Sequence, residues 1–252
     1  MTTTVPQWAM RMKACLNGGR KFPASAIELA EAAAGAVAAG ADALHVHPRD
    51  TTGRESLVAE DVGAAVAAIR AACPGVRVGV STGIWMTDGD ARRREALVRA
   101  WGDLAARPDF ASVNVHEQGF SDLVAVLHGA GIGVEAGVWE PAGADELDGL
   151  PLERVLVEVL GTPADRAVAK ADTILDRLGK AGYRGPRLLH GEGDACWPLV
   201  EHAGWLRLPT RIGLEDTLVL PDGRTAKDNA ELVREAVLIW SAALPPEGPQ
   251  ET

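Results

Sequence analysis

The chain alternates short apolar runs rich in β-branched residues with longer segments in which apolar positions recur every three or four residues. The short runs are typical of strands, and the longer segments are typical of amphipathic helices. The predicted strands cover residues 13–17, 43–47, 76–81, 110–115, 133–138, 154–160, 186–190 and 211–214. The first helix is predicted to begin near Ser25. The helices that follow the other strands are predicted to cover residues 59–72, 90–104, 122–128, 143–149, 163–182, 196–203 and 227–242.

A strand followed by a helix, repeated along one chain, predicts a parallel sheet. Eight such units in 252 residues favour a closed (β/α)8 TIM barrel of the α/β class over an open sheet. We expect one domain over residues 1–252, with the barrel spanning about residues 12–242 and the final PPEGPQET as a short disordered tail. Functional groups are then expected where strands end and loops begin.

The composition limits the kinds of partner this protein has. Apolar residues make up 47% of the chain, enough for a large core, and the net charge of −10 argues against a nucleic-acid or anionic-membrane surface. The three cysteines, Cys15, Cys73 and Cys196, form no CxxC pair and are expected to be reduced. No apolar run is long enough for a signal peptide or a membrane span. We therefore expect a soluble, cytoplasmic protein.

Polar side chains concentrate at the predicted carboxyl ends of the strands. This concentration is expected at the mouth of a barrel that carries an active site, and not at its base. The residues concerned are Asn17, Arg20, His45, His47, Arg49, Asp50, Ser81, Thr82, Asn114, His116, Glu117, Glu140, His190, Glu192, Arg211, Glu215 and Asp216.

The strongest signal among them is His45 and His47 on the second strand. Alternation along a strand places both imidazoles on one face, about 7 Å apart, where they can converge on one cation. Glu215 is placed to complete three ligands, because strands eight and two both flank strand one. Three ligands and an open position are typical of a catalytic zinc site, although manganese, iron or cobalt would also accept them. Alternatively, one histidine packs in the barrel and the other binds a carboxylate.

By the same alternation, Arg211, Gly213 and Glu215 share one face of the last strand. Gly213 leaves space there for a ligand or a neighbouring backbone. Asp216 has two candidate roles. It either pairs with Arg211 or a metal-bound histidine, or it serves as a general base close to a substrate.

Three further residues carry more general expectations. Glu158, inside the sixth strand, is expected to be buried and paired with Arg49 or a lysine. Trp85 and Trp197 follow strands three and seven and are candidates to line a pocket.

Four motifs resemble those of the beta-keto acid cleavage enzymes, the family of the 3-keto-5-aminohexanoate cleavage enzyme. They are LHVHPRD on the second predicted strand, STG at the end of the third, VN near the end of the fourth and RIGLEDT on the eighth. The resemblance runs from about residue 13 to residue 242. The resemblance is specific because HxHxR occurs together with a distant RxGxED. Either motif alone would not identify the family.

The resemblance implies a zinc-bearing TIM barrel, usually a homotetramer. It also implies conversion of a beta-keto acid and acetyl-CoA into acetoacetate and a new CoA ester. By motif match, His45, His47 and Glu215 would hold the zinc. The metal would chelate the keto oxygen and the carboxylate of the substrate and polarise the carbonyl.

Ser81, Arg211 and Asp216 match positions that the family uses around the substrate and in proton transfer. Asp216 would deprotonate the methylene next to the carbonyl, and the carbanion would attack the thioester. The released CoA would then cleave the adduct by a retro-Claisen step. Arg211 would orient Asp216 or stabilise oxyanion charge. The other candidates for the substrate site are Asn17, Arg20, Arg49, Thr82, Asn114 and Glu117.

The chain departs from the 3-keto-5-aminohexanoate cleavage enzyme at two of these positions. Where that enzyme has an acidic residue after the first strand, associated with an amino-bearing substrate, this chain has Gly19-Arg20. We expect Arg20 to face a neutral or anionic substrate tail. Glu117 stands where that enzyme has a hydroxyl residue. Arg49 is expected to orient other residues of the site without contacting the substrate itself.

Two other functions remain open at this point. A zinc-dependent amidohydrolase also has an HxH motif in a barrel, but on the first strand, with further histidines on strands five and six. A non-catalytic barrel that binds a metal or metabolite is the other alternative, against which the dense strand-end chemistry argues.

Overall fold

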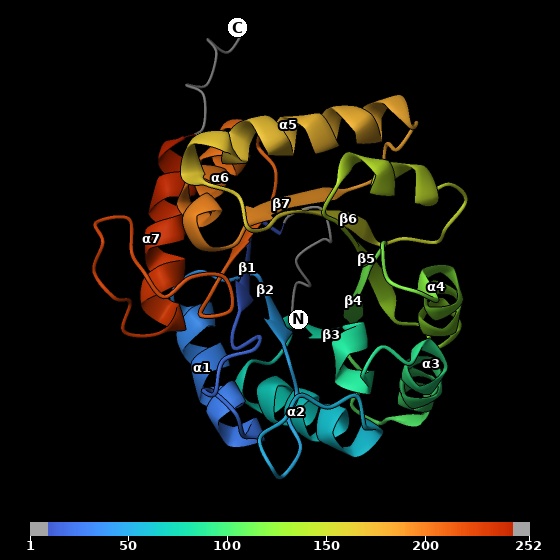
Figure 1. Cartoon of the computed structure of the whole chain (residues 1–252). Coiled ribbons are helices and arrows are strands. Elements are labelled where there is room, and N and C mark those ends of the chain that lie inside the picture. The colour runs from blue at the N-terminus through green and yellow to red at the C-terminus, as the bar shows by residue number, and fades with distance from the viewer. Residues whose placement is uncertain (1–9, 244–252) are drawn as a thin grey trace, which may run out of the picture.

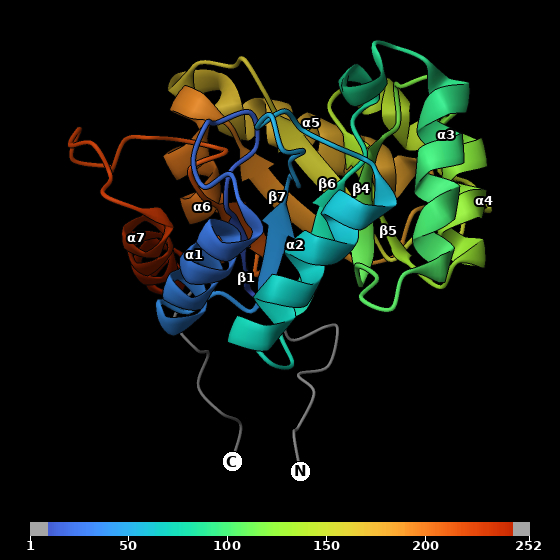
Figure 2. The ribbon, with the colours of Figure 1, turned by 90° about the horizontal axis from the view of Figure 1, so that it is seen from below.

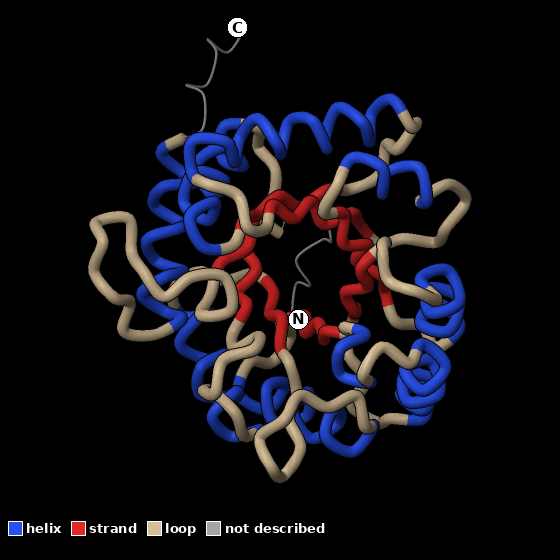
Figure 3. Tube along the Cα trace, in the orientation of Figure 1, coloured by secondary structure: helices blue, strands red, loops and turns tan. Residues whose placement is uncertain are grey.

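Eight parallel strands form a ring, and helices cover its outside (Figures 1 and 3). The computed structural model describes residues 10–243. Hydrogen-bonded neighbours follow the order β7-β6-β5-β4-β3-β2-β1-β8, and every pair is parallel. The strands are β1 Met12–Cys15, β2 Ala43–Val46, β3 Arg77–Ser81, β4 Phe110–Asn114, β5 Gly133–Val138, β6 Arg154–Val159, β7 Arg187–Gly191 and β8 Thr210–Ile212.

A helix follows each strand and packs against the outside of the ring, as α1 and α2 do in the side view of Figure 2. The fifth unit has a 3-10 helix in place of an α-helix, as the short segment between β5 and β6 predicts. The α-helices are α1 Ala26–Ala38, α2 Ala59–Ala72, α3 Ala91–Arg99, α4 Phe120–Gly129, α5 Ala164–Lys180, α6 Cys196–Trp205 and α7 Asn229–Ala242. The 3-10 helices are η2 Ile84–Thr87, η3 Ala100–Asp103, η4 Pro141–Glu146 and η5 Gly193–Ala195.

The ring closes between β7 and β8. The Leu189 amide donates to the Pro209 carbonyl at 3.0 Å, and the Thr210 hydroxyl donates to the Leu189 carbonyl at 2.8 Å. On its other side β8 pairs with β1. The sequence-based prediction of a (β/α)8 TIM barrel is therefore confirmed.

Charged side chains fill the barrel near the amino ends of the strands. Lys13 Nζ lies 2.5 Å from Glu135 Oε2, and Arg154 Nε lies 3.1 Å from Glu135 Oε1. Both cations also lie over the Phe110 ring, 5.5 and 5.4 Å from its centroid. Lys13 and Glu135 are completely buried. This end of the barrel is thus filled, and the functional groups at the other end stand on a packed base.

Local structure follows the sequence closely, with differences of one or two residues at most strand ends. Ser25 caps α1 as predicted: its hydroxyl accepts from the Glu28 amide, and the Glu28 carboxylate accepts from the Ser25 amide. The helix predicted over 90–104 is divided into α3 and η3. The predicted tail, PPEGPQET, lies outside the described residues. No helix among residues 10–243 is both long and apolar enough to cross a membrane.

Candidate metal centre and active site

His45 and His47 come from the carboxyl end of β2, and both point into the mouth of the barrel. Their exposed fractions are 1% and 5%. Leu44 and Val46, which alternate with them, are completely buried in the apolar core. The two Nε2 atoms lie 3.2 Å apart. The alternation predicted for this strand therefore brings both imidazoles to one point.

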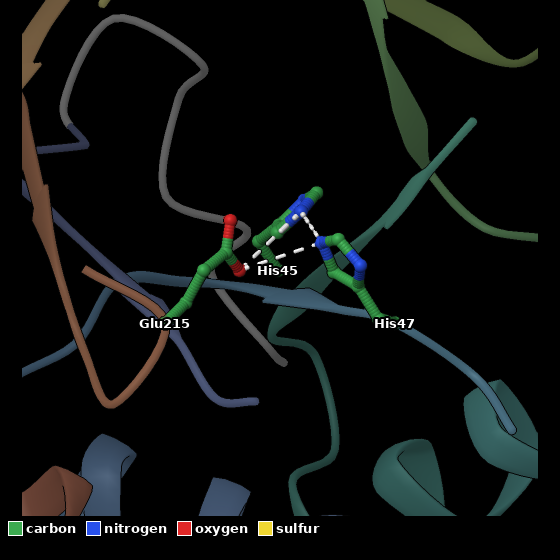
Figure 4. A group of neighbouring side chains, drawn as sticks. All are labelled: His45, His47 and Glu215. Carbon is green, nitrogen blue, oxygen red and sulfur yellow. Dashed lines mark hydrogen bonds and ion pairs between the residues drawn. The ribbon is translucent and has the colours of Figure 1, made fainter. Parts of the chain in front are cut away.

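Glu215 reaches the same point from the loop after β8 (Figure 4). Its Oε2 lies 3.7 Å from His45 Nε2 and 3.5 Å from His47 Nε2. The strand order explains this approach, because β8 and β2 lie on either side of β1. Glu215 can lie so close to β1 because Gly18 has no side chain: a Cβ there would lie 2.4 Å from Glu215 Cγ.

The spacing of these three side chains suits a divalent cation. All three ligand atoms lie within 4.8 Å of one another. Tetrahedral zinc with bonds of about 2.0–2.1 Å requires ligand atoms roughly 3.3 Å apart, close to the observed 3.2, 3.5 and 3.7 Å. Glu215 Oε2 is buried and has no hydrogen-bond partner among the described residues. A buried oxygen without a donor is what a metal ligand requires.

The electrostatics of the three groups also favour a positive charge at this point. Burial lowers the pKa of His45 well below its usual value. Burial acts in the same direction on His47, but the carboxylates of Glu215 and Glu55 outweigh it and raise that pKa to about 9. Burial would raise the pKa of Glu215, but the Arg211 guanidinium and the two histidines hold it well below its usual range. The carboxylate is therefore charged and needs a cation or the His47 proton beside it.

Arg211 joins Glu215 to Asp216. Its Nη2 donates to Glu215 Oε1 at 2.8 Å and to Asp216 Oδ1 at 2.7 Å, and its Nε donates to the same Oδ1 at 3.1 Å. Of the roles predicted for Asp216, pairing with Arg211 is observed. Asp216 Oδ2 is buried without a partner among the described residues, and burial raises the pKa of this carboxyl. A raised pKa and an oxygen without a donor both favour a role as proton acceptor.

A cavity of about 240 Å³ opens beside the three side chains. Ser81 and Asn114, two of the predicted site residues, line it together with Arg211. Trp85 lines it as well, whereas Trp197 donates to the Val219 carbonyl and lies elsewhere. Asp216 is not part of the cavity wall. The cavity is large enough for a small organic acid, and the hydroxyl of Ser81 and the guanidinium of Arg211 are donors among its lining groups.

The predicted residues from the first two loops hold the backbone rather than line the cavity. Asn17 Oδ1 accepts from the His47 amide at 2.9 Å, and Asn17 Nδ2 donates to the His47 carbonyl at 2.8 Å. Arg49 donates to the carbonyls of Gly18 and Arg20, both at 2.6 Å. The Arg20 side chain is exposed and donates to the Leu214 carbonyl. These contacts fix the loops that carry His47 and Glu215.

Thr82 and Glu117 support the wall from outside. The Thr82 hydroxyl donates to the Ser112 carbonyl at 2.6 Å. Glu117 pairs with Arg94, and it accepts from Asn114 Nδ2 at 2.8 Å. Neither residue lines the cavity. Of the six candidates for substrate binding, Asn114 is therefore the one whose side chain lies on the wall.

Glu158 is buried as predicted, but the expected partner is wrong. It pairs with His190, whose Nε2 lies 3.0 Å from Glu158 Oε2, and it accepts from Trp139 Nε1 at 3.1 Å. Glu158 and His190 are register partners on β6 and β7. This pair could have been predicted from the register of the two neighbouring strands, whereas the expectation of a cationic partner led to Arg49 or a lysine.

The sequence-based reasoning also missed Glu55, whose carboxylate contacts the imidazole of His47. No periodicity marks this residue, since it lies in the loop between β2 and α2.

The fold and the site define a TIM barrel with a candidate His/His/Glu metal centre at the mouth of its barrel. The model of the beta-keto acid cleavage enzyme family matches residues 17–246, nearly the whole chain. The chain belongs to this family, and the resemblance seen in its motifs is confirmed. The family is described as that of the beta-keto acid cleavage enzymes.

Solved structures agree on the fold. Two complexes of ObcA, one with oxaloacetate and one with a C4-CoA adduct and oxalate, superpose with a TM-score of 0.66 at 20% identity. The match covers 85% of this chain but 62% of ObcA, so the chain spans less than two thirds of that protein. The 3-dehydroquinate dehydratase of Geobacillus kaustophilus HTA426 has a TM-score of 0.62 at 12% identity, covering 92% of each chain. No curated protein matches the sequence.

Proposed function

We propose that this protein is a zinc-dependent enzyme that condenses a beta-keto acid with acetyl-CoA and releases acetoacetate and a new acyl-CoA. The observation that carries the proposal is the convergence of His45, His47 and Glu215 beside a cavity in the barrel mouth. Family membership supplies the class of substrate. ObcA, a structural neighbour, has been solved with oxaloacetate and with a C4-CoA adduct, which supports small keto acids and CoA as ligands.

Zinc bound by the three ligands would polarise the keto group of the substrate and make the neighbouring methylene acidic. Arg211, Ser81 and Asn114 line the cavity and would bind the carboxylate and keto oxygens of the substrate. Manganese, iron or cobalt would suit the same ligands, so the choice of zinc belongs to the proposal.

Asp216 would take the proton from the methylene on its unpartnered Oδ2. Arg211 binds Asp216 through Oδ1, and Oδ2 has no hydrogen-bond partner among the described residues. Because Oδ2 is buried and Asp216 does not line the cavity, the transfer requires the carboxylate to turn toward the substrate. The carbanion would then form a carbon–carbon bond to the thioester carbonyl and displace CoA as its thiolate. Attack of this thiolate on the original keto carbon would break the neighbouring carbon–carbon bond and release the new CoA ester and the enolate of acetoacetate. The proton held by Asp216 would return to this enolate and give acetoacetate.

A cytoplasmic location and a homotetramer complete the proposal. All three cysteines are buried and free, which supports a reducing compartment. The tetramer rests on the family resemblance.

Mass spectrometry of zinc-loaded protein with acetyl-CoA and a panel of beta-keto acids tests the reaction. We expect acetoacetate and a new CoA ester to appear together and to vanish with a chelator or with Glu215→Ala. Glu201→Gln, an exposed position on α6, is the matched control and should leave turnover unchanged. Hydrolysis without CoA would contradict the proposal and favour a hydrolase.

A further inference from the structure

Glu55 contacts a metal ligand on the side away from the metal position. It lies in the loop between β2 and α2, and its side chain is 16% exposed. Its Oε1 lies 2.5 Å from His47 Nδ1, whereas Glu215 lies on the Nε2 side of the same ring. His47 is therefore held between two carboxylates, one at each ring nitrogen.

The second oxygen of Glu55 is also engaged. Trp85 Nε1 donates to Glu55 Oε2 at 2.7 Å. The indole also stacks on the imidazole of His47, with ring centroids 6.3 Å apart and an angle of 22° between the planes. An antiparallel bridge between Arg49 and Glu55 fixes the loop backbone. Glu55 is thus held at both carboxylate oxygens and at its main chain.

The chemistry of imidazole gives this arrangement a function. A neutral imidazole carries one proton, and a carboxylate at Nδ1 places that proton on Nδ1. The lone pair of His47 is then on Nε2, which faces His45 Nε2 and Glu215 Oε2. His45 differs, because its Nδ1 is buried without a partner among the described residues. Of the two histidines, His47 alone has its orientation fixed by a carboxylate.

We propose that Glu55 is a positioning residue of the metal site. It holds His47 in the tautomer and orientation that present Nε2 to a divalent cation, and Trp85 holds Glu55 in place. Carboxylates in this position orient the imidazole ligands of zinc and make them more basic. The inference rests on the metal site of the proposed function and concerns metal affinity as well as turnover.

An amide at position 55 separates this role from simple packing. Glutamine keeps the shape of the side chain but offers one acceptor oxygen in place of two. Two donors, His47 Nδ1–H and Trp85 Nε1–H, compete for that oxygen, and one of them must face the NH2 group. Glu55→Gln should therefore weaken the site although its volume is unchanged. Trp85→Phe removes one donor, leaves Glu55 bound to His47, and should give a smaller loss.

The test is zinc affinity, measured by competition with a chromophoric chelator, together with the visible absorption of the cobalt-substituted protein. We expect Glu55→Gln to lower zinc affinity about 10- to 100-fold and to change the cobalt spectrum, which reports ligand geometry. Glu201→Gln should match the wild type in both. Melting of the metal-free proteins checks that each variant folds. If Glu55→Gln does not fold, Trp85→Phe carries the test.

The outcomes separate this inference from the proposed function. Equal zinc affinity and equal cobalt spectra in wild type and in Glu55→Gln would overturn the role of Glu55 and leave the metal site standing. If the wild type bound neither ion, the metal site itself would fail, and the role of Glu55 with it. A loss of affinity confined to Glu55→Gln and Trp85→Phe would support the positioning role.

Discussion

Arg211 is the residue on which the charge balance of the site depends. Its guanidinium is buried and contacts two carboxylates, Glu215 in the candidate metal centre and Asp216 next to it. The guanidinium of Arg211 thus orients both a candidate metal ligand and a candidate base. Because a charged group buried without its partner is costly, the three side chains are expected to act as one unit.

The division of roles within this unit leads to a prediction for Asp216. Asp216→Asn keeps the shape and one acceptor for Arg211 but cannot accept a proton, so kcat should fall about 10²- to 10⁴-fold. Zinc affinity should remain close to that of the wild type, because Glu215 keeps its bond to Arg211. Steady-state kinetics and a zinc competition assay measure the two quantities. Asp222→Asn, an exposed site, is the control. Parallel loss of zinc and turnover would instead assign Asp216 to support of the metal.

The convergence of the three candidate ligands could be predicted from the sequence, but most of the contacts that support them could not. His45 and His47 follow from alternation, and Glu215 follows from the adjacency of strands. Glu55 lies in a loop that has no period, so nothing in the sequence relates it to His47. The sequence places Asn17 and Arg49 at the site but does not predict their hydrogen-bond partners. These partners are backbone groups of loops, whose positions do not depend on the residue type.

At the scale of the elements, ion pairs connect neighbouring parts of the barrel near the amino ends of its strands. Arg77 on β3 donates to both oxygens of Glu153 at 2.6 and 2.7 Å, and Arg154 on β6 pairs with the same carboxylate. Glu153 is 6% exposed at its side chain. Burial would raise the pKa of Glu153, but the two guanidinium groups outweigh it and lower that pKa.

This shift predicts how stability changes with pH. A folded-state pKa below the unfolded value near 4.5 means that Glu153 stabilises the protein above that pH and stops doing so as pH falls through its folded pKa. Glu153→Gln should cost about 2 kcal/mol at pH 7 and should flatten the acid side of the stability curve. Urea unfolding at several pH values measures both. Glu140→Gln breaks an exposed pair with Lys170 and should change little. An unchanged acid limb in Glu153→Gln would refute the assignment.

The order and type of the elements could be predicted because each β-branched run and each amphipathic segment has its own period. Their ends could not be predicted to the residue. The strand predicted over 211–214 is Thr210–Ile212, since at Gly213 the chain already turns into the loop and passes against the Cys15 carbonyl. The helix predicted over 90–104 becomes 3-10 after Arg99, where Trp101 turns into the core.

In the whole molecule, the candidate metal centre brings together residues that are far apart in the sequence. The histidines belong to β2, near the start, and Glu215 follows β8, near the end, while β1 lies between them. A cation bound to all three side chains would link the carboxyl end of the second strand to the loop after the last strand.

Zinc should therefore raise the melting temperature of the whole protein. At a free concentration of about 100 times Kd, binding stabilises the folded state by about 2.7 kcal/mol. For a chain of this size that corresponds to a rise of about 5–10 °C. Thermal melting with zinc and with a chelator measures the shift. Glu215→Ala should remove it, and a shift of equal size in that variant would mean that zinc acts elsewhere.

Two glycines lie close to Glu215, Gly18 against its side chain and Gly213 two residues before it in the chain. A methyl group at Gly18 would strike Glu215, and one at Gly213 would lie 1.9 Å from the Cys15 carbonyl. Gly213 thus allows the end of the last strand to approach the first strand, and Gly18 leaves the space that the Glu215 side chain occupies. In genome searches, the pattern to look for should therefore include these glycines as well as the three ligands. We expect a homologue that keeps HxH and the glutamate but has larger residues at both positions to have lost the geometry of this centre.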